Sequence, residues 1–383
     1  MRMNGAMRHL RAAGSLALLL AVSPLASQTI STIAGNGLFG AAKEGVAAAA
    51  SPFSFQEGTP GGLAFDRDGN LYVSEAGTSR VWKVDRKTGL LTSVAGTGEP
   101  GFSGDGGPAS AARLREPGDL AFDRDGNLYI ADLGNNRVRR VDGKSGLIGT
   151  FAGSGRPIFT ADGLPATETP IGRPSGIVFD AAGNLFVVES YAGRLLRVDG
   201  TTGLVSTIVG NGTTTLRRDA KSGAGTGLPV PCSARMTSAG EIVFSATGAN
   251  TLMKVSPSTG ELTWLAGTGI PGYTGDGGPA RKAQLSQPSS IAVDRGDNVW
   301  FVDWENNAIR RVDAKTGIIE TRVGSSRPDR YGDMKTAGFA GDGGPATKAQ
   351  LWRPTAVAFD GDGNLYVLDS KNHRIRKVEK AAP

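Results

Sequence analysis

The strongest constraint in this sequence is a repeat that recurs six times at nearly constant spacing. The copies open at Pro60, Pro117, Pro174, Pro231, Pro288 and Pro354, and successive intervals are 57, 57, 57, 57 and 66 residues. A long fixed period of this kind is the signature of a solenoid, a propeller or an array. The repeat therefore outweighs the two or three domains that a length of 383 residues would otherwise suggest.

Each of the first five copies contains four short runs of strand-forming residues separated by turn sequences, and the sixth contains three. In the first copy the runs cover residues 63–66, 71–75, 80–84 and 90–95, and the turns between them include DRDGN and RKTG. Asp, Gly and Asn are the residues that tight hairpin turns require. Four antiparallel strands make one propeller blade. The sequence thus predicts an all-β fold, a six-bladed β-propeller.

The two ends of the repeat array indicate how the ring closes. The sixth copy stops near Val378 without a fourth strand, while QTISTIAGNG, from Gln28 to Gly37, resembles the fourth strand of the other copies, such as LLTSVAGTG. We expect this N-terminal strand to complete the last blade. The propeller is then predicted over residues 28–383.

The first 27 residues have the pattern of a secretory signal. Arg2, Arg8 and Arg11 precede or open an apolar run, residues 12–22, which is followed by the small-residue exit SPLAS. A run of eleven residues is shorter than the ~20 that span a bilayer. We therefore predict that residues 1–27 are a signal peptide, that the protein is exported to the periplasm or the cell exterior, and that it has no transmembrane segment.

Charge and cysteine content limit the partners further. Removing the three signal-peptide arginines from 42 Lys and Arg leaves 39 against 36 Asp and Glu, without a basic stripe. Nucleic-acid binding usually requires such a stripe, so we expect no nucleic-acid partner. Cys232 is the only cysteine, so no intrachain disulfide can form, and we expect it to pack as a small apolar residue in a monomeric protein.

One motif within the repeat resembles a known family. DLGNNRVRRV from Asp132 and DSKNHRIRKV from Asp369 match the core D-x-x-N-x-R-I/V-x-x-V of the NHL repeat. The resemblance covers nearly all of the chain after the signal and implies a six-bladed propeller. The family includes binding and sensor domains, and related six-bladed propellers include lyases and lactonases.

The order of strands places the turns on two different faces. Turns between the first and second strands (such as residues 66–70) and between the third and fourth (such as 85–90) lie on one side, which we call the short-turn face. Turns between the second and third strands (such as 75–80) and the connections between blades begin on the other side, the long-loop face. These connections run to about twenty residues, and loops of that length more often carry function.

Three connections share the motif GDGGPA. The motif occurs in GFSGDGGPASAARL from Gly101, GYTGDGGPARKAQL from Gly272 and GFAGDGGPATKAQL from Gly338, with a relative, TADGLPATETP, from Thr160. Consecutive backbone N–H groups in GDGG could surround an anion. The alternative is a cap over the gap between blades, in which the Asp caps a short helical turn. The repetition favours the cap.

An acidic residue also recurs at the second-to-third turn, with an arginine five positions later. The pairs are Glu75/Arg80, Asp132/Arg137, Glu189/Arg194 and Asp369/Arg374. An ion pair that fixes each turn is the simpler interpretation. A ring of carboxylates around the axis that holds a hard cation is the functional one. Asp303, whose counterpart five positions on is Ala308, is predicted to be unpaired and is the best candidate for such a role.

Other chemistries are limited by the residues available. Only His373 follows the signal, so a three-histidine zinc site is impossible, and no G-x-S-x-G motif marks a serine nucleophile. DRDGN places Gly fourth instead of sixth, unlike a calcium-binding EF-hand loop. A lactonase-like metal hydrolase or lyase with carboxylate ligands remains open.

The most consistent function is a non-catalytic scaffold outside the cytoplasm that recognises a protein, peptide or glycan through its long-loop face. No catalytic residue and no cofactor is predicted, although a divalent cation is possible, held by the five acids. Trp304 and Tyr191 lie near the expected channel mouth and could stack on ligands. The predicted ligand-binding set is Glu75, Asp132, Glu189, Tyr191, Asp303, Trp304 and Asp369.

Two connections depart from the repeat and are predicted to lie near the binding site. The connection from Gly210 to Val230 lacks GDGG and leads into a degenerate fourth copy, in which Ala246 and Thr251 replace the acid and the arginine. The connection between copies five and six carries a nine-residue insertion around SRPDRYGDMKTAG. We therefore expect function to lie around blades four to six.

Overall fold

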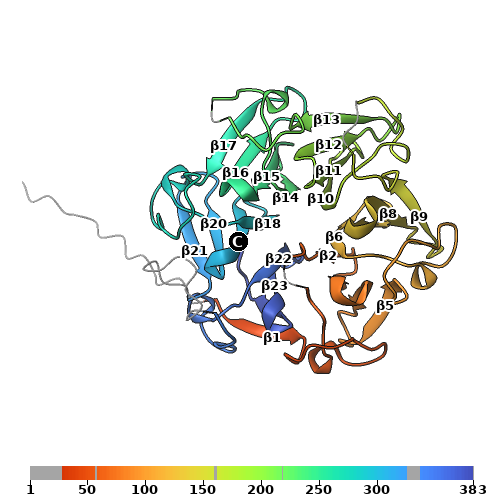
Figure 1. The fold of residues 1–383 in the computed structure, drawn as a ribbon. Helices are drawn as coiled ribbons and strands as arrows, with labels where there is room; N and C mark the ends of the chain where they lie inside the picture. The colour runs from red at the N-terminus through yellow and green to blue at the C-terminus, as the bar shows by residue number, and fades with distance from the viewer. Residues whose placement is uncertain (1–27, 57, 159–161, 218, 326–336, 383) are drawn as a thin grey trace, which may run out of the picture.

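The computed structural model describes residues 28–56, 58–158, 162–217, 219–325 and 337–382 (Figure 1). The predicted signal peptide, residues 1–27, lies outside the described residues, and so does most of the insertion between blades five and six, at 326–336. Within the described residues, no helix combines the length and the apolar character needed to cross a bilayer.

Six four-stranded antiparallel sheets form a ring around a central axis, as the repeat predicts (Figure 1). Blade one consists of β2 (Leu63–Phe65), β3 (Leu71–Glu75), β4 (Arg80–Val84) and β5 (Leu91–Ala95). Blade two consists of β6 (Pro117–Phe122), β7 (Leu128–Asp132), β8 (Arg137–Val141) and β9 (Ile148–Ala152), and blade three of β10 (Pro174–Phe179), β11 (Leu185–Glu189), β12 (Arg194–Val198) and β13 (Val205–Val209). Blade four consists of β14 (Pro231–Met236), β15 (Ile242–Ala246), β16 (Thr251–Val255) and β17 (Leu262–Ala266), and blade five of β18 (Pro288–Val293), β19 (Val299–Asp303), β20 (Ala308–Val312) and β21 (Ile319–Val323). Blade six contains β22 (Pro354–Phe359), β23 (Leu365–Asp369) and β24 (Arg374–Val378).

The N-terminal strand closes the ring. β1 (Ile30–Ala34) pairs antiparallel with β24, in a register that places Ile30 opposite Val378, and the sheet order is β1-β24-β23-β22. The first and last described strands therefore share one blade, which confirms the predicted closure. An array closed in this way leaves no unpaired blade end.

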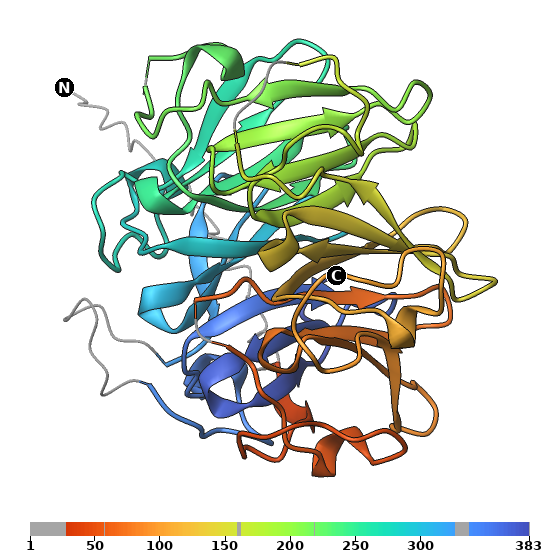
Figure 2. The same ribbon diagram turned by 45° about the vertical axis from the view of Figure 1, so that its right-hand side comes forward.

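The hydrophobic core lies between neighbouring blades, which pack face to face around the axis (Figure 2). One cluster joins Val81 and Ala95 of blade one with Leu120 and Ile130 of blade two, and all four are buried. Because each sheet is covered on both faces, its strands are apolar at successive positions and do not alternate with polar residues.

The connections also contribute to this core. The short 3-10 turn Ala109–Ala111 packs with the buried Ala112 between blades one and two, and Ala109 O accepts a hydrogen bond from Gly96 N at the end of β5. The turns Ala280–Lys282 and Ala346–Lys348 occupy the same place in later connections. These connections therefore fill the gaps between blades, as the cap interpretation predicts.

Aspartate side chains build the turns of the short-turn face. Asp66 Oδ1 accepts hydrogen bonds from the backbone N–H groups of Asp68 and Asn70, at 3.0 and 2.8 Å. Asn70 then accepts a hydrogen bond from Arg86 N at the next turn. The polar groups of DRDGN are thus used within the hairpin, which agrees with the prediction of a structural turn.

Candidate functional site

The five acids that were predicted to form a ring of carboxylates each lie at the end of the second strand of a blade, and all are buried. None has measurable solvent exposure: Glu75, Asp132, Glu189, Asp303 and Asp369. Each accepts a hydrogen bond from a backbone N–H in the loop that leads to the inner strand of its blade. Asp132 accepts from Arg115 at 2.8 Å, and Asp303 from Ser286 at 2.7 Å. These carboxylates therefore tie the connection to the second strand.

The arginine that pairs with these acids differs from the one predicted in two of the four pairs. Asp132 pairs with Arg139, whose Nη1 lies 3.4 Å from Oδ2, and Asp369 pairs in the same way with Arg376 at 3.7 Å. The partner is thus seven positions after the acid, not five. Glu189 forms the expected ion pair, with Arg194 at 2.5 Å. Glu75 instead accepts a hydrogen bond from Trp82 Nε1 at 2.7 Å, and Arg80 donates to Thr97 O.

The prediction that Asp303 is unpaired is wrong for the same reason. Arg310 Nη1 lies 3.3 Å from Asp303 Oδ2, and both side chains are completely buried. Residues two apart on a strand point to the same face, so Arg310 reaches the acid from the position beyond Ala308. The presence of Ala308 where other blades have an arginine therefore does not affect the ion pair between Asp303 and Arg310.

Each of these buried arginines also binds the Asp of the preceding GDGG connection. Arg139 lies 2.5 Å from Asp105, Arg310 2.7 Å from Asp276, and Arg376 2.6 Å from Asp342. We call this arrangement the arginine clamp: Arg139, Arg310 or Arg376 held between two aspartates. It exists in blades two, five and six, which are the blades that follow a GDGGPA connection.

The GDGG connections differ from the sequence predictions in two ways: the aspartate does not cap the helical turn, and backbone N–H groups that could have bound an anion are bonded within the protein. The Asp of GDGG binds an arginine and makes no hydrogen bond that caps the short 3-10 turn. In the first of these connections, Gly106 N donates to Ile148 O and Gly107 N donates to Gly104 O. These N–H groups are therefore used within the fold.

Burial alters the ionisation of the clamp acids. Removal from water raises the pKa of Asp132 and Asp303 to about 6, and that of Asp369 to about 7. Each acid lies in its own blade, and in the described part of the chain no three His, Cys, Asp or Glu side chains converge as metal ligands would. A cation held by these five acids stays a prediction.

Blades one, three and four lack the clamp in different ways. In blade one, Trp82 replaces the arginine, and its Nε1 donates to Glu75 at 2.7 Å. In blade three, Leu196 stands at that position. Blade four has neither charge, because the acid is Ala246 and the arginine is Met253.

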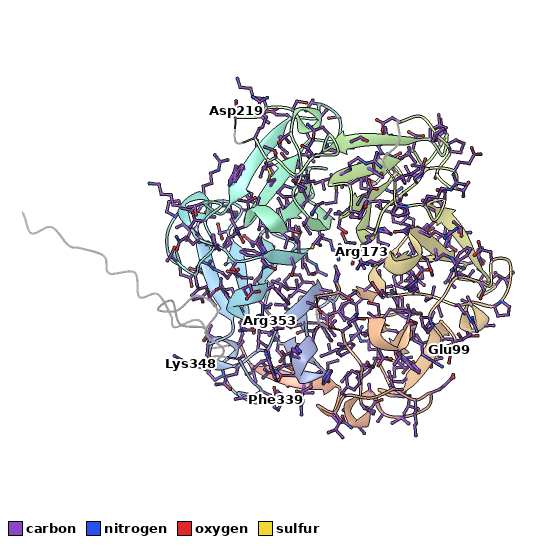
Figure 3. All side chains as sticks on the ribbon, viewed as in Figure 1. Glu99, Arg173, Asp219, Phe339, Lys348 and Arg353 are labelled. Carbon is purple, nitrogen blue, oxygen red and sulfur yellow. The ribbon has the colours of Figure 1, made fainter. Side chains whose placement is uncertain are left out.

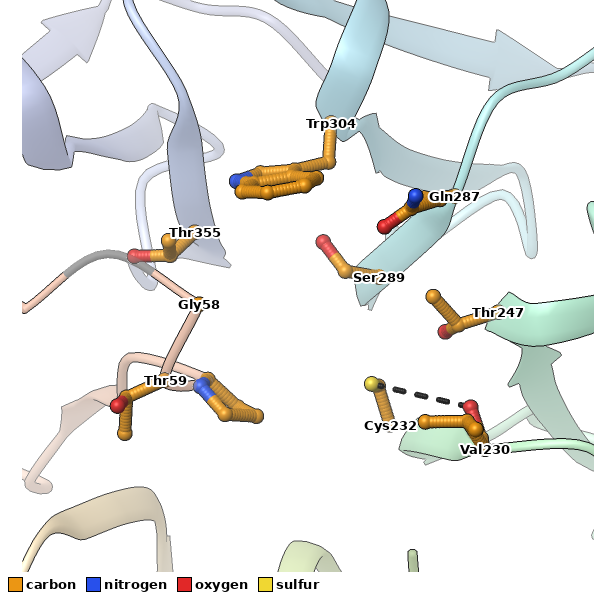
Figure 4. A pocket seen from close by; sticks show the side chains of 10 residues that line it. Gly58, Thr59, Val230, Cys232, Thr247, Gln287, Ser289, Trp304 and Thr355 are labelled. Atoms are coloured by element: carbon orange, nitrogen blue, oxygen red, sulfur yellow. Dashed lines mark hydrogen bonds between the residues drawn. The ribbon is translucent and has the colours of Figure 1, made fainter.

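A pocket opens at the centre of the ring on the long-loop face (Figure 4). Inner strands begin on this face, and the second-to-third turns lie there, so residues from these two places surround the pocket. Its volume is about 160 Å³. The lining residues come from blades one, four, five and six: Gly58, Thr59, Pro60, Val230, Cys232, Thr247, Gln287, Ser289, Trp304 and Thr355. We call it the axial pocket.

The structure brings one of the two predicted aromatic residues to the axial pocket. Trp304 lines it, and the Arg353 guanidinium lies 4.2 Å from the indole ring, held by an ion pair with Glu305 at 2.7 Å. Tyr191 does not line the pocket, and its side chain is 65 % exposed. The ring of Trp304 is therefore fixed by its neighbours, whereas Tyr191 projects from the surface.

The polar groups of the axial pocket are few and uncharged. Thr247 Oγ1 donates to Pro288 O at 2.6 Å, and the hydroxyls of Thr355 and Ser370 bond to each other. Ser289 Oγ is buried and has no hydrogen-bond partner within the described residues. No Asp, Glu, Lys or Arg is among the residues that line the pocket.

Cys232 is a pocket residue that the sequence did not single out. Its side chain is half-buried, and Sγ lies 4.0 Å from Val230 O (Figure 4). Burial raises the pKa of the thiol, so it stays protonated at neutral pH. The interpretation of Cys232 as a small packing residue missed its place at the axis.

Exposed apolar side chains gather on the long-loop face. Phe102 lies 3.8 Å from the Arg137 guanidinium, beside a second-to-third turn, and Phe339 stacks in the same way on Arg374. Phe39 is 72 % exposed and contacts the ring of His373. In Figure 3, Phe339 lies at the rim of the ring, while Arg353 lies nearer the axis.

A largely buried ion pair joins the inner strands of blades two and four, which lie on either side of blade three. Arg235 of blade four makes two hydrogen bonds with the Asp119 carboxylate of blade two, at 2.8 and 2.9 Å. Burial alone would lower the pKa of Arg235, but the Asp119 carboxylate raises it above the ordinary value. Sequence reasoning missed this pair. The sequence does carry one sign of it: when the six copies are aligned, Arg235 occupies a position at which the other five have Ala or Val.

Comparisons with known proteins agree with this architecture. The Teneurin NHL domain profile matches residues 253–331, and the NHL repeat profile matches residues 114–141 and 351–378. Protein SUPPRESSOR OF QUENCHING 1, chloroplastic, from Arabidopsis thaliana is 28 % identical over 268 residues, covering 67 % of this chain and 25 % of that protein. NHL repeat-containing protein 2 from Bos taurus is 28 % identical over 327 residues, covering 84 % of this chain and 38 % of that protein.

This chain therefore spans less than two-fifths of the length of these relatives. Among solved structures, an auxiliary nutrient binding protein from Bacteroides thetaiotaomicron superposes with a TM-score of 0.65 at 16 % sequence identity. The match covers 92 % of this chain and 76 % of that chain. At this identity it indicates the fold alone.

Proposed function

We propose that this chain, a β-propeller that matches the NHL repeat profile and the Teneurin NHL domain profile, is a non-catalytic binding scaffold that recognises its target through the long-loop face. The target class is a protein, peptide or glycan outside the cytoplasm. The name of the Bacteroides neighbour, an auxiliary nutrient binding protein, is in keeping with a binding role.

The observation that carries the proposal is the contrast between the two faces. The axial pocket opens on the long-loop face, where Tyr191, Phe39 and Ile270 are each at least 60 % exposed. On the short-turn face, the exposed apolar residues include leucines at third-to-fourth turns, such as Leu147 and Leu204, and polar groups such as those of Asp66 and Asn70 are bonded within their own turns. Exposed apolar groups around a pocket are typical of a binding surface.

The metal-dependent hydrolase or lyase is the alternative that the sequence raised, and the geometry favours it less. Such a site needs carboxylates that share one ion. The five candidate acids are buried, and each is already bonded to groups of its own blade, such as Arg139 and Arg115 N around Asp132. Elemental analysis of the purified protein tests this alternative: a stoichiometric divalent ion lost in Asp303→Asn would favour the enzyme.

Peptide and glycan arrays probed with labelled protein (residues 28–383) test the scaffold directly. The variant Tyr191→Ser/Val230→Ser changes two exposed residues of the long-loop face. Its matched control, Leu147→Ser/Leu204→Ser, changes two residues with 43 % and 42 % exposure at third-to-fourth turns. We expect the array signal to fall at least tenfold in the first variant and to persist in the control. Equal loss in both, or loss in the control alone, would contradict the proposal.

A further inference from the structure

We infer that the axial pocket receives one uncharged aromatic side chain of the protein or peptide that the long-loop face binds. This inference rests on the proposed function and adds the chemistry of the anchor residue. Trp304, Ser289 and Val230 carry the argument, together with the size of the pocket.

The size of the pocket fits a single side chain better than a free small molecule. Its volume of about 160 Å³ is below the ~300 Å³ at which pockets for small molecules usually begin. Protein interfaces commonly depend on one or a few large side chains, often Trp or Tyr, that fill pockets near the centre of the contact. The axial pocket has this central position, because it lies where the inner strands meet.

The lining selects an uncharged, flat group. No ionisable carboxylate, ammonium or guanidinium lines the pocket, so a charged side chain would lose its hydration without gaining a partner. Trp304 offers an aromatic surface that is already positioned by Arg353 at 4.2 Å. A second aromatic ring packs well against such a surface in a stacked or edge-to-face arrangement.

Ser289 further favours an aromatic group with a polar edge. Its Oγ has no hydrogen-bond partner among the described residues, and rotation about χ1 would turn it from its buried position into the pocket, where a bond to an incoming O–H or N–H would be favourable. Tyrosine and tryptophan carry such a group, and phenylalanine does not. We therefore expect the order Tyr and Trp before Phe.

The surface around the pocket indicates a polypeptide as the source of this side chain. Val230 belongs to the pocket wall and is 51 % exposed, so the apolar lining continues onto the outer surface. Opposite charges alternate on the surrounding surface, since Glu116 pairs with Arg173 at 3.1 Å and Glu305 with Arg353 at 2.7 Å. A peptide that inserts one aromatic ring into the pocket would cover the exposed part of Val230 with its flanking backbone. The two ion pairs are neutral, so they would not repel it.

The only cysteine of the chain provides a direct reporter. Cys232 lines the pocket, so an occupant should slow its reaction with N-ethylmaleimide, a neutral thiol reagent. The probes are capped amino acids at millimolar concentration: N-acetyl-tyrosinamide, N-acetyl-tryptophanamide and N-acetyl-phenylalaninamide, compared with the alaninamide and lysinamide analogues and with methyl glucoside. We expect tyrosine and tryptophan probes to slow labelling at least twofold, with a saturable dose dependence.

Two variants connect this protection to the pocket wall. Trp304→Ala should abolish protection by the aromatic probes while Cys232 still reacts. Trp304→Phe keeps an aromatic surface and should retain part of the protection, which guards against a misfolded alanine variant. Leu147→Ser is the matched control, because it removes an exposed apolar residue at a third-to-fourth turn that does not line the pocket, and its protection should equal that of the wild type.

The results separate this inference from the proposed function. Equal protection by the alaninamide or lysinamide analogue, protection by methyl glucoside alone, or no protection at all would overturn the aromatic anchor. If array ligands still bind the long-loop face and Trp304→Ala leaves their affinity unchanged, the anchor is wrong and the scaffold stands. If array binding is indifferent to long-loop substitutions, the proposed function itself fails.

Discussion

Blades two, five and six can be compared with blade four, which has the same strands but none of the same charges. In blade five, Arg310 lies between Asp303 and Asp276, whereas blade four has Met253 and Ala246 at the matching positions of its second and third strands. Both blades form complete four-stranded sheets. The arginine clamp is therefore one solution to joining a connection to its blade, and apolar packing is another.

The comparison also separates structural from functional residues. In the three clamped blades the arginine and the strand aspartate are buried and bind each other, and only the connection aspartate is partly exposed. Blade four, without a clamp, gives three residues to the axial pocket, Val230, Cys232 and Thr247, and extends Arg235 to Asp119 of blade two. The regular part of the repeat thus stabilises the ring, and its irregular part shapes the site.

The largest effect is expected from removing the strand that completes blade six. Deletion of residues 28–34 removes all of β1 and exposes the edge of β24. Blade six would then lose the closure that the other five blades obtain from their own fourth strands. We expect the cooperative thermal transition seen by circular dichroism to disappear or to fall by tens of degrees. A deletion variant that melts like the protein of residues 28–383 would contradict ring closure.

Converting one clamp to the residue of blade four should cost several kcal/mol. Arg310→Met leaves Asp303 and Asp276 without their partner, and breaking a buried pair by removing one charge typically costs about 3–5 kcal/mol. The matched control is Met253→Leu in blade four, a swap of similar volume that costs less than ~1.5 kcal/mol. Chemical denaturation measures both free energies of unfolding.

A second substitution in the same blade sharpens this result. Arg310→Met/Asp303→Ala reproduces the pair found in blade four and removes the buried unpaired charge, so that only the partly exposed Asp276 lacks its arginine. Its loss should therefore be smaller than the sum of the two single losses. Strict additivity of the two substitutions would mean that the clamp residues do not act as a pair.

The ion pair between Arg235 and Asp119 should have a smaller effect. Arg235→Met leaves Asp119 buried without its arginine, but the Arg235 side chain is 20 % exposed in the channel and solvent partly compensates. We expect a loss of roughly 1–3 kcal/mol. Adding Asp119→Ser, which installs the residue that blades four and five carry there, should recover part of the loss. No recovery would indicate that Arg235 acts through packing alone.

The smallest effect is a dependence of stability on pH that arises from the clamped blades. Burial raises the pKa of Asp369 to about 7 and that of Asp303 to about 6, above the ~3.9 of an unfolded chain. A raised folded pKa stabilises the fold at low pH, and this stabilisation is lost as pH rises through the folded value. These groups should therefore lower the free energy of unfolding between pH 4 and pH 7. Asp369→Asn should flatten this slope, and an unchanged slope would contradict the raised pKa.

The fold could be predicted because the turn motifs and the spacing of the repeats can both be read directly from the sequence. DRDGN fixes a hairpin wherever it occurs, and six copies with one missing strand leave little choice but a closed ring. The pairing of Asp303 was mispredicted because a five-residue spacing was read from the motif. Which arginine reaches the acid depends on strand register and on the second carboxylate, Asp276, which comes from a separate connection.

The site was only partly predictable for a related reason. Trp304 was found because it is an aromatic residue at a turn that faces the axis. The place of Cys232 and Ser289 in the pocket was missed, because the pocket forms only where residues of four blades come together in the folded ring. Asp119 and Arg235 are 116 positions apart, and without an alignment only their departure from the repeat could have indicated them.

Asp303 and Trp304 are neighbours in the chain. Together they test the central claim that buried ion pairs stabilise the propeller while the axial pocket binds an aromatic side chain of the ligand. The measurement is the protection of Cys232 by N-acetyl-tyrosinamide, recorded beside the melting temperature, in Asp303→Asn and Trp304→Ala. The account predicts that Asp303→Asn lowers the melting temperature and keeps protection, whereas Trp304→Ala keeps the melting temperature within a few degrees and loses protection. Loss of protection in Asp303→Asn with an unchanged melting temperature, or full protection in Trp304→Ala, would contradict it.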